Sequence, residues 1–282
     1  MHNITVMNKL SVVIVNLNNA EGLKKTLSSV FDKQTFKGVE CIVIDRGSGD
    51  GSADSIKGYE DKISYWVSEP DRGVYNAMNK GVVKATGEYL LFLDSGDRLA
   101  DNVLIKVFAE PFVEDIVYGD LMYCCGSKES KLVTFPDKIS VMDMLLNPLE
   151  RQSVFIRREL FAGNLYKEEY KMVSDWAFLI EEFVYRNRTS RHLAVTLSYR
   201  NLCGAPDGNE NRALILEEKR DFLDKYHPVL TDLMRVYRYA GALDTISNHR
   251  TKELVSSLWI QRSARHYMKL LLTVKKWFKI KG

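Results

Sequence analysis

The sequence has little cysteine and no pairing pattern among the cysteines it does have. Its 282 residues include four, at positions 41, 124, 125 and 203. They form no C-x-x-C pair and none of the spacings of a zinc site. We therefore expect no structural zinc, and we expect the thiols to reside in a reducing compartment. Cys41 falls in an apolar run, where a buried thiol is the ordinary interpretation.

Long apolar runs, a targeting segment and an excess of charge are also missing. No apolar run approaches the roughly 20 residues that a membrane-spanning helix needs. Residues 1–10 lack the basic segment and apolar stretch of a secretory signal. Forty Lys and Arg against 37 Asp and Glu leave a net charge of only +3, and no nucleic-acid-binding motif accompanies it. These absences predict a cytoplasmic protein that does not bind nucleic acid.

The composition that remains is that of a folded protein. Hydrophobic residues make up 45% of the chain and charged residues 27%, which argues against disorder. A single core stops growing at roughly 250–300 residues. The length therefore suits one large domain, or one domain with an appendage.

Apolar runs alternate with helical patterns through the first third of the chain. The runs are rich in β-branched residues and read as strands buried on both faces, which are typical of parallel sheets. Strands are predicted at residues 10–15, 39–44, 63–67 and 89–93, and helices at residues 23–31, 52–59 and 74–85. This order predicts an α/β fold with an open, mostly parallel sheet flanked by helices.

The later part of the chain is less regular. Further strands are predicted at residues 116–123, 152–156 and 192–199, and helices at residues 175–185, 209–225, 229–239 and 252–281. The last stretches form a helical C-terminal extension.

Polar side chains follow each of the first four predicted strands. They are Asn16, Asn18, Asp45, Asp71, Arg72, Asp94 and Asp97. In open α/β sheets, ligands bind beyond the carboxyl ends of the strands. The sequence therefore predicts a polar site at this edge of the sheet.

Asp94 and Asp97 are the first candidates for chemistry. Two carboxylates three residues apart on a tight turn can converge on a hard cation such as Mg²⁺ or Mn²⁺. The alternative is that Asp94 caps the turn while Asp97 caps a helix starting near Asp101. The residues alone leave these two interpretations equally open.

Asp45 and Arg72 carry similar alternatives. Asp45 could accept hydrogen bonds from a base or ribose, or could simply form a turn with Gly47. Arg72 could bind a diphosphate, or could be a solvated surface arginine. The glycines of residues 45–51 fit neither the dinucleotide fingerprint nor the P-loop.

Four ordered blocks of residues 10–99 resemble the family 2 glycosyltransferases of GT-A fold. They are residues 11–18, 43–52, 68–81 and 85–97, and the third contains Pro70-Asp71-Arg72-Gly73. That block is most similar to members that build bacterial exopolysaccharides. Residues 151–161 and 174–176 resemble the family more weakly. The resemblance covers about two-thirds of the chain.

The resemblance implies a GT-A (Rossmann-like) domain over residues 1–205. Its nucleotide-binding half would be residues 8–100 and its acceptor half residues 101–205, followed by the extension at 206–282. It implies an inverting glycosyltransferase that moves a sugar from a nucleotide-diphosphate sugar, a UDP-sugar by default, to an acceptor hydroxyl. The acceptor would be a saccharide or lipid-linked saccharide in cell-surface polysaccharide synthesis.

The resemblance also implies roles for individual residues. Asp175 would be the catalytic base, and Asp97 with Asp94 would hold Mn²⁺ or Mg²⁺. The nucleotide-sugar would be bound by Asn16, Asn18, Asp45, Asp71, Arg72, Gly73, Asn79, Asp94 and Ser95. The acceptor or donor-sugar side would be formed by Arg151, Gln152, Ser153 and Trp176.

Three positions depart from the family pattern. Gly96 stands where an acidic residue is frequent, Arg151 where a histidine is usual, and Asn16-Leu17 where the family has Thr-Tyr. The first departure leaves Asp97 as the safer metal ligand. The departures at Gly96 and Arg151 leave open an alternative, in which the protein binds a nucleotide-sugar but has no catalytic activity. A phosphotransferase using Asp94 is disfavoured, because that class expects its aspartate pair after the first strand.

The C-terminal tail is a separate hypothesis. Lysines from Lys269 to Lys281 alternate with apolar residues such as Trp277 and Phe278. A basic amphipathic helix can lie on an anionic membrane surface. We expect either peripheral attachment at the inner face of the plasma membrane, or a helix packed on its own domain with a solvated lysine face.

Overall fold

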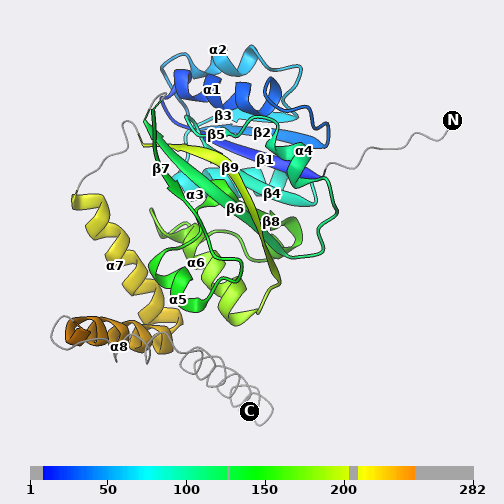
Figure 1. Cartoon of the computed structure of the whole chain (residues 1–282). Coiled ribbons are helices and arrows are strands. Elements are labelled where there is room, and N and C mark those ends of the chain that lie inside the picture. Colours follow the sequence, from blue (N-terminus) through cyan, green and yellow to red (C-terminus); the bar gives the residue numbers. More distant parts are fainter. Residues whose placement is uncertain (1–8, 126–127, 203–208, 245–282) are drawn as a thin grey trace, which may run out of the picture.

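The computed structural model describes residues 9–125, 128–202 and 209–244 (Figure 1). A nine-stranded mixed sheet runs through the molecule in the order β3-β2-β1-β4-β8-β6-β9-β5, with β7 paired to β6. The basic C-terminal tail lies outside the described residues, so the membrane hypothesis stays a prediction.

The first half of the sheet is parallel, as predicted. Its strands are β1 (Leu10–Asn16), β2 (Val39–Asp45), β3 (Tyr65–Ser68) and β4 (Tyr89–Asp94). The connecting helices are α1 (Ala20–Phe31), α2 (Ser52–Lys57) and α3 (Val74–Lys84). Val15 pairs in register with Ile44 on one side and Asp94 on the other. The polar residues after β1, β2 and β4 therefore meet at one edge of the sheet.

The second half of the sheet is mixed. Its strands are β8 (Val154–Arg157), β6 (Ile116–Cys125), β9 (Ser190–Asn201), β5 (Arg98–Leu99) and β7 (Lys128–Val133). β8 runs antiparallel to both β4 and β6, whereas β6 and β9 are parallel. The predicted strand at 152–156 begins only at Val154, because a 3₁₀ turn, η1 (Arg151–Ser153), precedes it.

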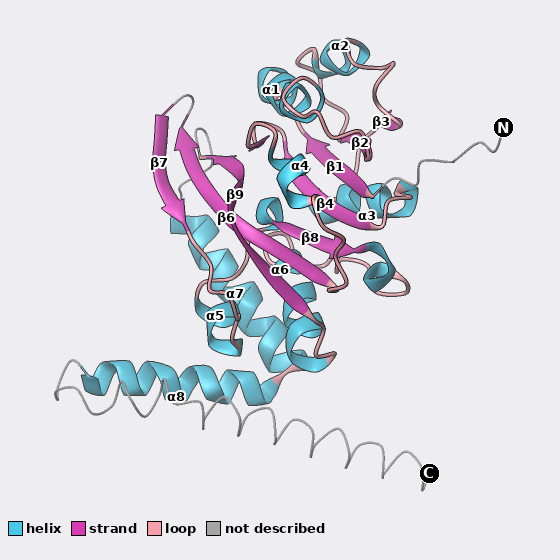
Figure 2. Cartoon of the chain, turned by 45° about the vertical axis from the view of Figure 1, so that its right-hand side comes forward, coloured by secondary structure: helices cyan, strands magenta, loops and turns pink. Residues whose placement is uncertain are grey.

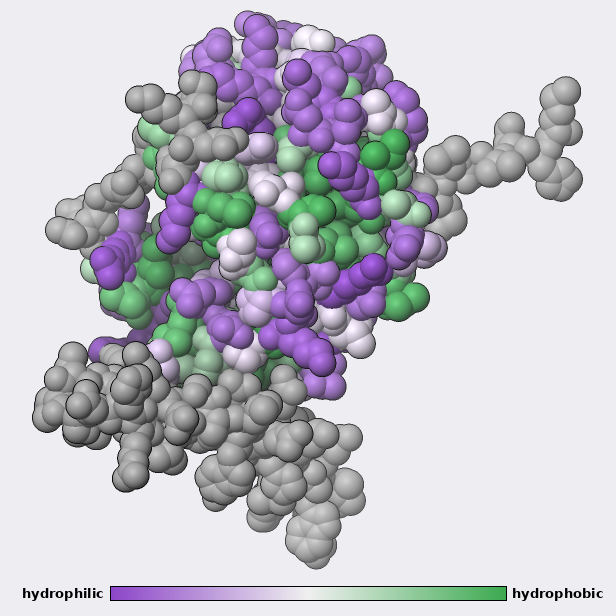
Figure 3. All heavy atoms as spheres, viewed as in Figure 1, coloured by the Kyte–Doolittle hydropathy of each residue, from purple (hydrophilic) through white to green (hydrophobic). Residues whose placement is uncertain are grey.

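Helices cover both faces of the sheet (Figure 2). In β1, Val13 belongs to the same buried cluster as Met78 of α3, while Ile14 belongs to the opposite cluster with Leu23 and Leu27 of α1. This double burial explains why β1 reads as a continuous apolar run. The outer face over α1 and α2 is mostly hydrophilic (Figure 3).

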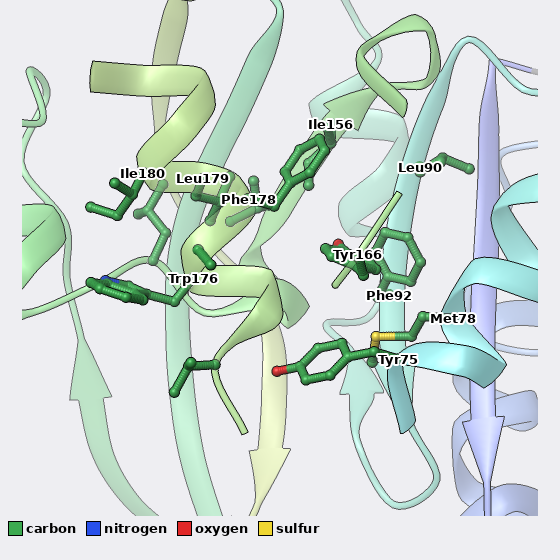
Figure 4. Close-up of a cluster of buried hydrophobic side chains, with 14 of the residues drawn as sticks. Tyr75, Met78, Leu90, Phe92, Ile156, Tyr166, Trp176, Phe178, Leu179 and Ile180 are labelled. Atoms are coloured by element: carbon green, nitrogen blue, oxygen red, sulfur yellow. The ribbon is translucent and has the colours of Figure 1, made fainter. Parts of the chain in front are cut away.

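The remaining helices surround the second half of the sheet. They are α4 (Val103–Val107), α5 (Val141–Leu146), η2 (Arg158–Phe161), α6 (Ser174–Ile180), η3 (Glu181–Tyr185), α7 (Asn209–Tyr226) and α8 (Pro228–Asp244). Trp176 and Phe178 of α6 pack in the same core as Phe92 and Tyr75 (Figure 4). Phe222 of α7 joins that core, so the first helix of the predicted extension is attached to the sheet domain.

Three cysteines lie among the described residues. Cys41 and Cys124 are buried free thiols. Cys125 is disulfide-bonded, a pairing that the spacing of the cysteines did not predict. The reason is that sequence spacing does not show which cysteines meet in space. Within the described residues, no helix is long and apolar enough to cross a bilayer.

Candidate active site

The turn after β4 separates the two candidate metal ligands. The chain reverses at Gly96, whose φ of +107° lies in the region that favours glycine. Gly96 donates its N–H to Thr26 Oγ1 at 2.9 Å, and Asp97 donates its N–H to the Asp94 carbonyl at 3.0 Å. This geometry leaves the side chain of Asp94 35% exposed, whereas Asp97 is only 3% exposed.

Asp97 lies below the surface of the site and its carboxylate is already bound. Gln152 Nε2 and the Asn201 N–H each donate to it at 2.9 Å. Burial and the nearby charge of Asp94 raise the pKa of Asp97 to about 7. Asp97 is therefore held inside the turn by hydrogen bonds, and Asp94 is the more exposed of the two carboxylates, while metal binding by either residue stays a prediction.

Arg151 connects Asp94 to the predicted base. Its Nη1 donates to Asp175 Oδ2 at 2.8 Å, and its Nη2 donates to Asp94 Oδ2. Burial lowers the pKa of Arg151, but the two carboxylates outweigh burial and the pKa lies well above its usual value. Its Nε is buried without a partner among the described residues. A charged guanidinium therefore stands between the two acids.

Asp175 is held on its other side by Tyr75. The Tyr75 hydroxyl points from α3 toward the start of α6 (Figure 4) and donates to Asp175 Oδ1 at 2.8 Å. The Trp176 N–H donates to the same oxygen at 2.8 Å. Burial and the Asp175 charge raise the pKa of Tyr75 well above its usual value, so its hydroxyl stays a donor. Both oxygens of Asp175 are therefore positioned by neighbours.

These groups line one cavity of about 430 Å³ at the strand ends. It brings together five residues that the sequence proposed, which are Asp94, Arg151, Gln152, Asp175 and Trp176. Its charged side chains are Asp94, Glu150 and Asp175 against Arg151, Lys171, Arg200 and Lys219. A pocket of this size with more cations than carboxylates suits a small anionic ligand.

Asp45 and the residues around it form a separate buried network. Asp45 Oδ1 accepts from Asn16 Nδ2 at 2.6 Å and from Ser48 Oγ at 2.6 Å, and Ser68 donates to its other oxygen. Burial acts to raise the pKa of Asp45, but these hydrogen bonds outweigh it and the pKa is lowered. Asn16 Oδ1 is buried without a partner among the described residues.

Asn18 completes this edge of the site. Its φ of +48° is left-handed, and its Oδ1 accepts from the Gly49 N–H at 3.0 Å. Its own N–H donates to Ser48 Oγ at 2.7 Å. The loops after β1 and β2 are thereby fastened together beside Asp45.

Asp71, Gly73 and Arg72 do not line the cavity. Asp71 accepts from Arg46 Nε at 2.9 Å and from the Gly73 N–H at 3.0 Å, which ties the loop after β3 to the loop after β2. The Arg72 side chain is 77% exposed and pairs with Glu168 at 2.6 Å. The structure therefore places Asp71 and Gly73 in a loop connection and Arg72 on the surface.

Three further candidates also lie outside the cavity. Asn79 exchanges two hydrogen bonds with the backbone of Tyr166, each of 2.9 Å, so it anchors the loop after η2. Ser153 is buried and donates to the Glu150 carbonyl. Ser95 uses its carbonyl to accept from Asn19 at 2.7 Å.

The site fits a cation brought by a phosphate ligand better than a protein-only metal site. No group of three or more His, Cys, Asp or Glu in the described ranges could hold a metal ion. Asp94 Oδ1, however, accepts no hydrogen bond from those ranges, and the side chain reaches the cavity. Mg²⁺ in such sites usually takes one or two carboxylates and completes its shell with phosphates and water. Asp94 fits that single-anchor arrangement.

Several cavity residues carried no signal in the sequence. Arg200 ends β9 and pairs with Glu150, and Lys219 comes from α7. Neither lies in a motif, and both reach the site only because distant elements fold over it. Tyr75 could have been found, because it lies three residues after Arg72 at the start of α3.

Comparison with known proteins identifies the family and the fold. Residues 11–150 match the model of the family described as glycosyl transferase family 2. The chain is 30% identical to the PGL/p-HBAD biosynthesis glycosyltransferase of Mycobacterium bovis BCG over 203 residues, which are 69% of this chain and 77% of that protein. A 45% identity to an uncharacterized glycosyltransferase of Mycobacterium tuberculosis spans only 92 residues, 32% of this chain and 35% of the relative.

Two solved structures share the fold. Staphylococcus aureus TarS 1–349 in complex with UDP superposes with a TM-score of 0.58 at 20% identity, covering 69% of this chain and 60% of that one. The mannosyltransferase PcManGT of Pyrobaculum calidifontis, in complex with GDP-Man and Mn²⁺, has a TM-score of 0.57 at 14% identity, covering 93% and 83%. Both confirm the expected GT-A architecture.

Proposed function

The chain belongs to glycosyltransferase family 2, and from that premise we propose that it is an inverting transferase. Its donor would be a nucleoside-diphosphate sugar, UDP-linked by default, of the hexosyl or N-acetylhexosaminyl class. The observation that carries the proposal is the cavity in which Arg151 contacts both Asp94 and Asp175. The cavity combines the carboxylate proposed as base, a second carboxylate that is partly exposed, and more cationic than anionic side chains.

Asp175 would act as the general base. The acceptor oxygen attacks the anomeric carbon as the bond to the nucleoside diphosphate breaks, and Asp175 takes the hydroxyl proton. General-base catalysis contributes about 10²–10⁴-fold to rate. Tyr75 and the Trp176 N–H fix one oxygen of Asp175, so the other, now paired with Arg151, is the one that would receive the proton.

The cations of the cavity would stabilise the leaving group. Arg151 is fully charged and lies beside Asp94, and Lys171 and Arg200 line the same cavity. A diphosphate entering here would meet these cations beside the base. Asp94 would anchor Mn²⁺ or Mg²⁺, which supplies further charge neutralisation to the diphosphate when bound.

The Asn16–Asp45 network would hold the nucleoside. The unpartnered Asn16 Oδ1 is a buried acceptor, and the imide N–H of a base such as uracil would satisfy it. The loops around the nucleoside would be held in place by the remaining candidates, which are Asn18, Asp71, Arg72, Gly73, Asn79 and Ser95. Residues 8–100 would thus form the nucleotide half, residues 101–205 the acceptor half, and residues 206–282 an extension.

The acceptor would be a saccharide or lipid-linked saccharide of bacterial cell-surface polysaccharide synthesis. Gln152 supports the turn that carries Asp94, and Trp176 lines the cavity beside Asp175. Cytoplasmic placement with peripheral attachment through the basic tail is part of the same proposal.

A thermal-shift screen of nucleotide sugars with and without Mn²⁺ tests the donor proposal. A ligand at about 100 times its Kd adds roughly 2.7 kcal/mol of stability. We expect one nucleotide sugar to raise the Tm in the wild type, and Asp94→Asn to lose the Mn²⁺-dependent part of that shift. Failure of every nucleotide sugar to change the Tm would contradict the proposal.

A second candidate is a nucleotide-sugar-binding protein without activity. The observation in its favour is that Arg151 engages the predicted base directly. Donor binding without hydrolysis or transfer, with every acceptor supplied, would favour this candidate. Nucleoside diphosphate release that depends on Asp175 would exclude it.

A further inference from the structure

A second, largely apolar cavity lies beside the candidate active site. Its volume is about 670 Å³, and four helices line it. The apolar walls are Leu145 and Leu146 of α5, Trp176 of α6, Leu216 and Leu223 of α7, and Met234 of α8. We call this cavity the helical groove.

The helical groove is open to solvent through apolar side chains. Leu216 is 63% exposed and Leu146 is 37% exposed. Leu145 and Leu223 are almost fully buried beneath them. An exposed apolar patch over a hollow is a feature of ligand-binding grooves.

The helical groove borders the active-site cavity. Trp176 and Lys219 line both. The indole of Trp176 is fixed by donation from Nε1 to the Met144 carbonyl at 2.7 Å, and Lys219 Nζ lies 4.7 Å from its ring. The residue before Trp176 is Asp175, so a molecule with a hydroxyl at the base would reach the groove by passing Trp176 and Lys219.

The junction itself is amphipathic. Lys219 presents an ammonium where the groove meets the cavity, and Arg220 lines the groove wall. Lys219 and Asp175 line the same cavity, and burial lowers the pKa of Lys219 while the charge of Asp175 opposes that change. A polar head group would therefore be accommodated at the junction and an apolar tail beyond it.

We propose that the helical groove binds the apolar tail of an amphipathic acceptor whose hydroxyl-bearing head lies at Asp175. This inference rests on the proposed transferase activity and names the class of acceptor for it. The groove volume is within the range of about 300–1,000 Å³ typical of small-molecule sites. A purely saccharide acceptor would leave the apolar walls without a function.

Alkyl glycosides test the proposal directly. Transfer is measured as nucleoside diphosphate release with glycosides that carry two-carbon or twelve-carbon chains, below the concentration at which the latter form micelles. Each methylene buried contributes up to roughly fourfold in affinity. We expect the KM of the long-chain acceptor to be at least about tenfold lower in the full-length wild type.

Leu216→Gln is the diagnostic variant, because Leu216 is exposed and its replacement leaves the core intact. We expect it to raise the KM for the twelve-carbon acceptor about five- to tenfold and to leave the two-carbon acceptor within twofold of wild type. Ile105→Gln is the matched control, since Ile105 is 51% exposed on α4, away from the groove. It should behave as wild type. Equal dependence on chain length in both variants would overturn the proposal.

Calorimetric binding of dodecyl glucoside without donor separates this proposal from the transferase proposal. Binding that Leu216→Gln weakens about five- to tenfold supports the groove even if no acceptor is ever turned over. Donor hydrolysis without alkyl binding that depends on Leu216 would support the transferase proposal and contradict the groove proposal. A lower Tm in Leu216→Gln with unchanged alkyl affinity would show that the chain itself fills the groove, and also overturns the proposal.

Discussion

Arg151 Nη1 lies 2.8 Å from Asp175 Oδ2, so the predicted catalytic base is ion-paired inside its own cavity. The same guanidinium binds Asp94, the proposed metal anchor. A histidine, usual at this position in the family, could not bridge two acids with parallel N–H groups as an arginine does. The departure at position 151 is therefore a feature that changes how the two acids are held.

Asp175→Asn should abolish transfer while leaving donor binding nearly intact. The amide retains the hydrogen bond from Tyr75 but cannot take a proton, so we expect kcat to fall by about 10²–10⁴-fold. The donor Kd should change by less than about threefold, because the substitution removes proton transfer in the transition state and not a contact with the bound donor. Steady-state kinetics and calorimetry measure both. Asp61→Asn, on the exposed surface, is the control, and full activity of Asp175→Asn would remove Asp175 from the mechanism.

Arg151→Met should destabilise the protein. It leaves Asp94 and Asp175 without their cation, but their side chains are 35% and 17% exposed, so solvent screening brings the cost below that of a fully buried pair, to about 1–3 kcal/mol. Arg151→Lys keeps the positive charge but loses the two guanidinium N–H groups that bind Asp94 and Asp175 separately. We therefore expect a stable protein with reduced kcat/KM. Arg191→Met removes a partly exposed pair with Glu110 and should cost less than about 1 kcal/mol. Urea unfolding compares the three, and a stable, fully active Arg151→Met would show that the bridge has no role.

Asp97 should make the ligand-free protein less stable as the pH rises toward neutrality. The native pKa of about 7 exceeds that of the unfolded chain, so between about pH 4 and 7 the native state holds a proton that the unfolded state has released. The contribution of Asp97 is therefore present at low pH and is lost as the pH rises to 7. One such proton changes the free energy of unfolding by up to about 1.4 kcal/mol per pH unit.

Asp97→Asn should flatten that pH dependence. Urea unfolding in the presence of a metal chelator, at half-unit steps from pH 4.5 to 7.5, measures the slope. Asp54→Asn is the control, since the Asp54 side chain is 84% exposed. The same slope in wild type and Asp97→Asn would show that Asp97 is ionised throughout this range.

Gly96→Ala should destabilise the turn that carries Asp94. The φ of +107° is strained for any residue with a Cβ, at about 1–3 kcal/mol, and the new Cβ would lie 3.1 Å from Asn201 Nδ2. An acidic residue here, frequent in the family, would meet the same strain. Gly49→Ala is the control because a Cβ there meets nothing within 4 Å. Equal stability of the two variants, measured by urea unfolding, would refute this account of Gly96.

The sequence by itself determined the parallel half of the sheet and the edge at which its polar residues meet. Strands such as β1 are buried on both faces, so nearly every residue in them is apolar. Such a continuous apolar run can be recognised in the sequence without knowledge of distant contacts. Asp45 and Asp94 follow directly from that pattern, because the carboxyl ends of neighbouring parallel strands coincide. The ordered blocks then identified the family, which the comparisons confirm.

Only the tertiary structure distinguishes the surroundings of the two acids. The family resemblance favours Asp97 as the metal ligand, but the positive φ of Gly96 turns Asp94 toward the cavity and Asp97 into the protein. Arg200 and Lys219 reach the cavity from β9 and α7, far along the chain. Such convergence depends on long-range packing, which has no local period or spacing, and so it could not be predicted from the residues alone.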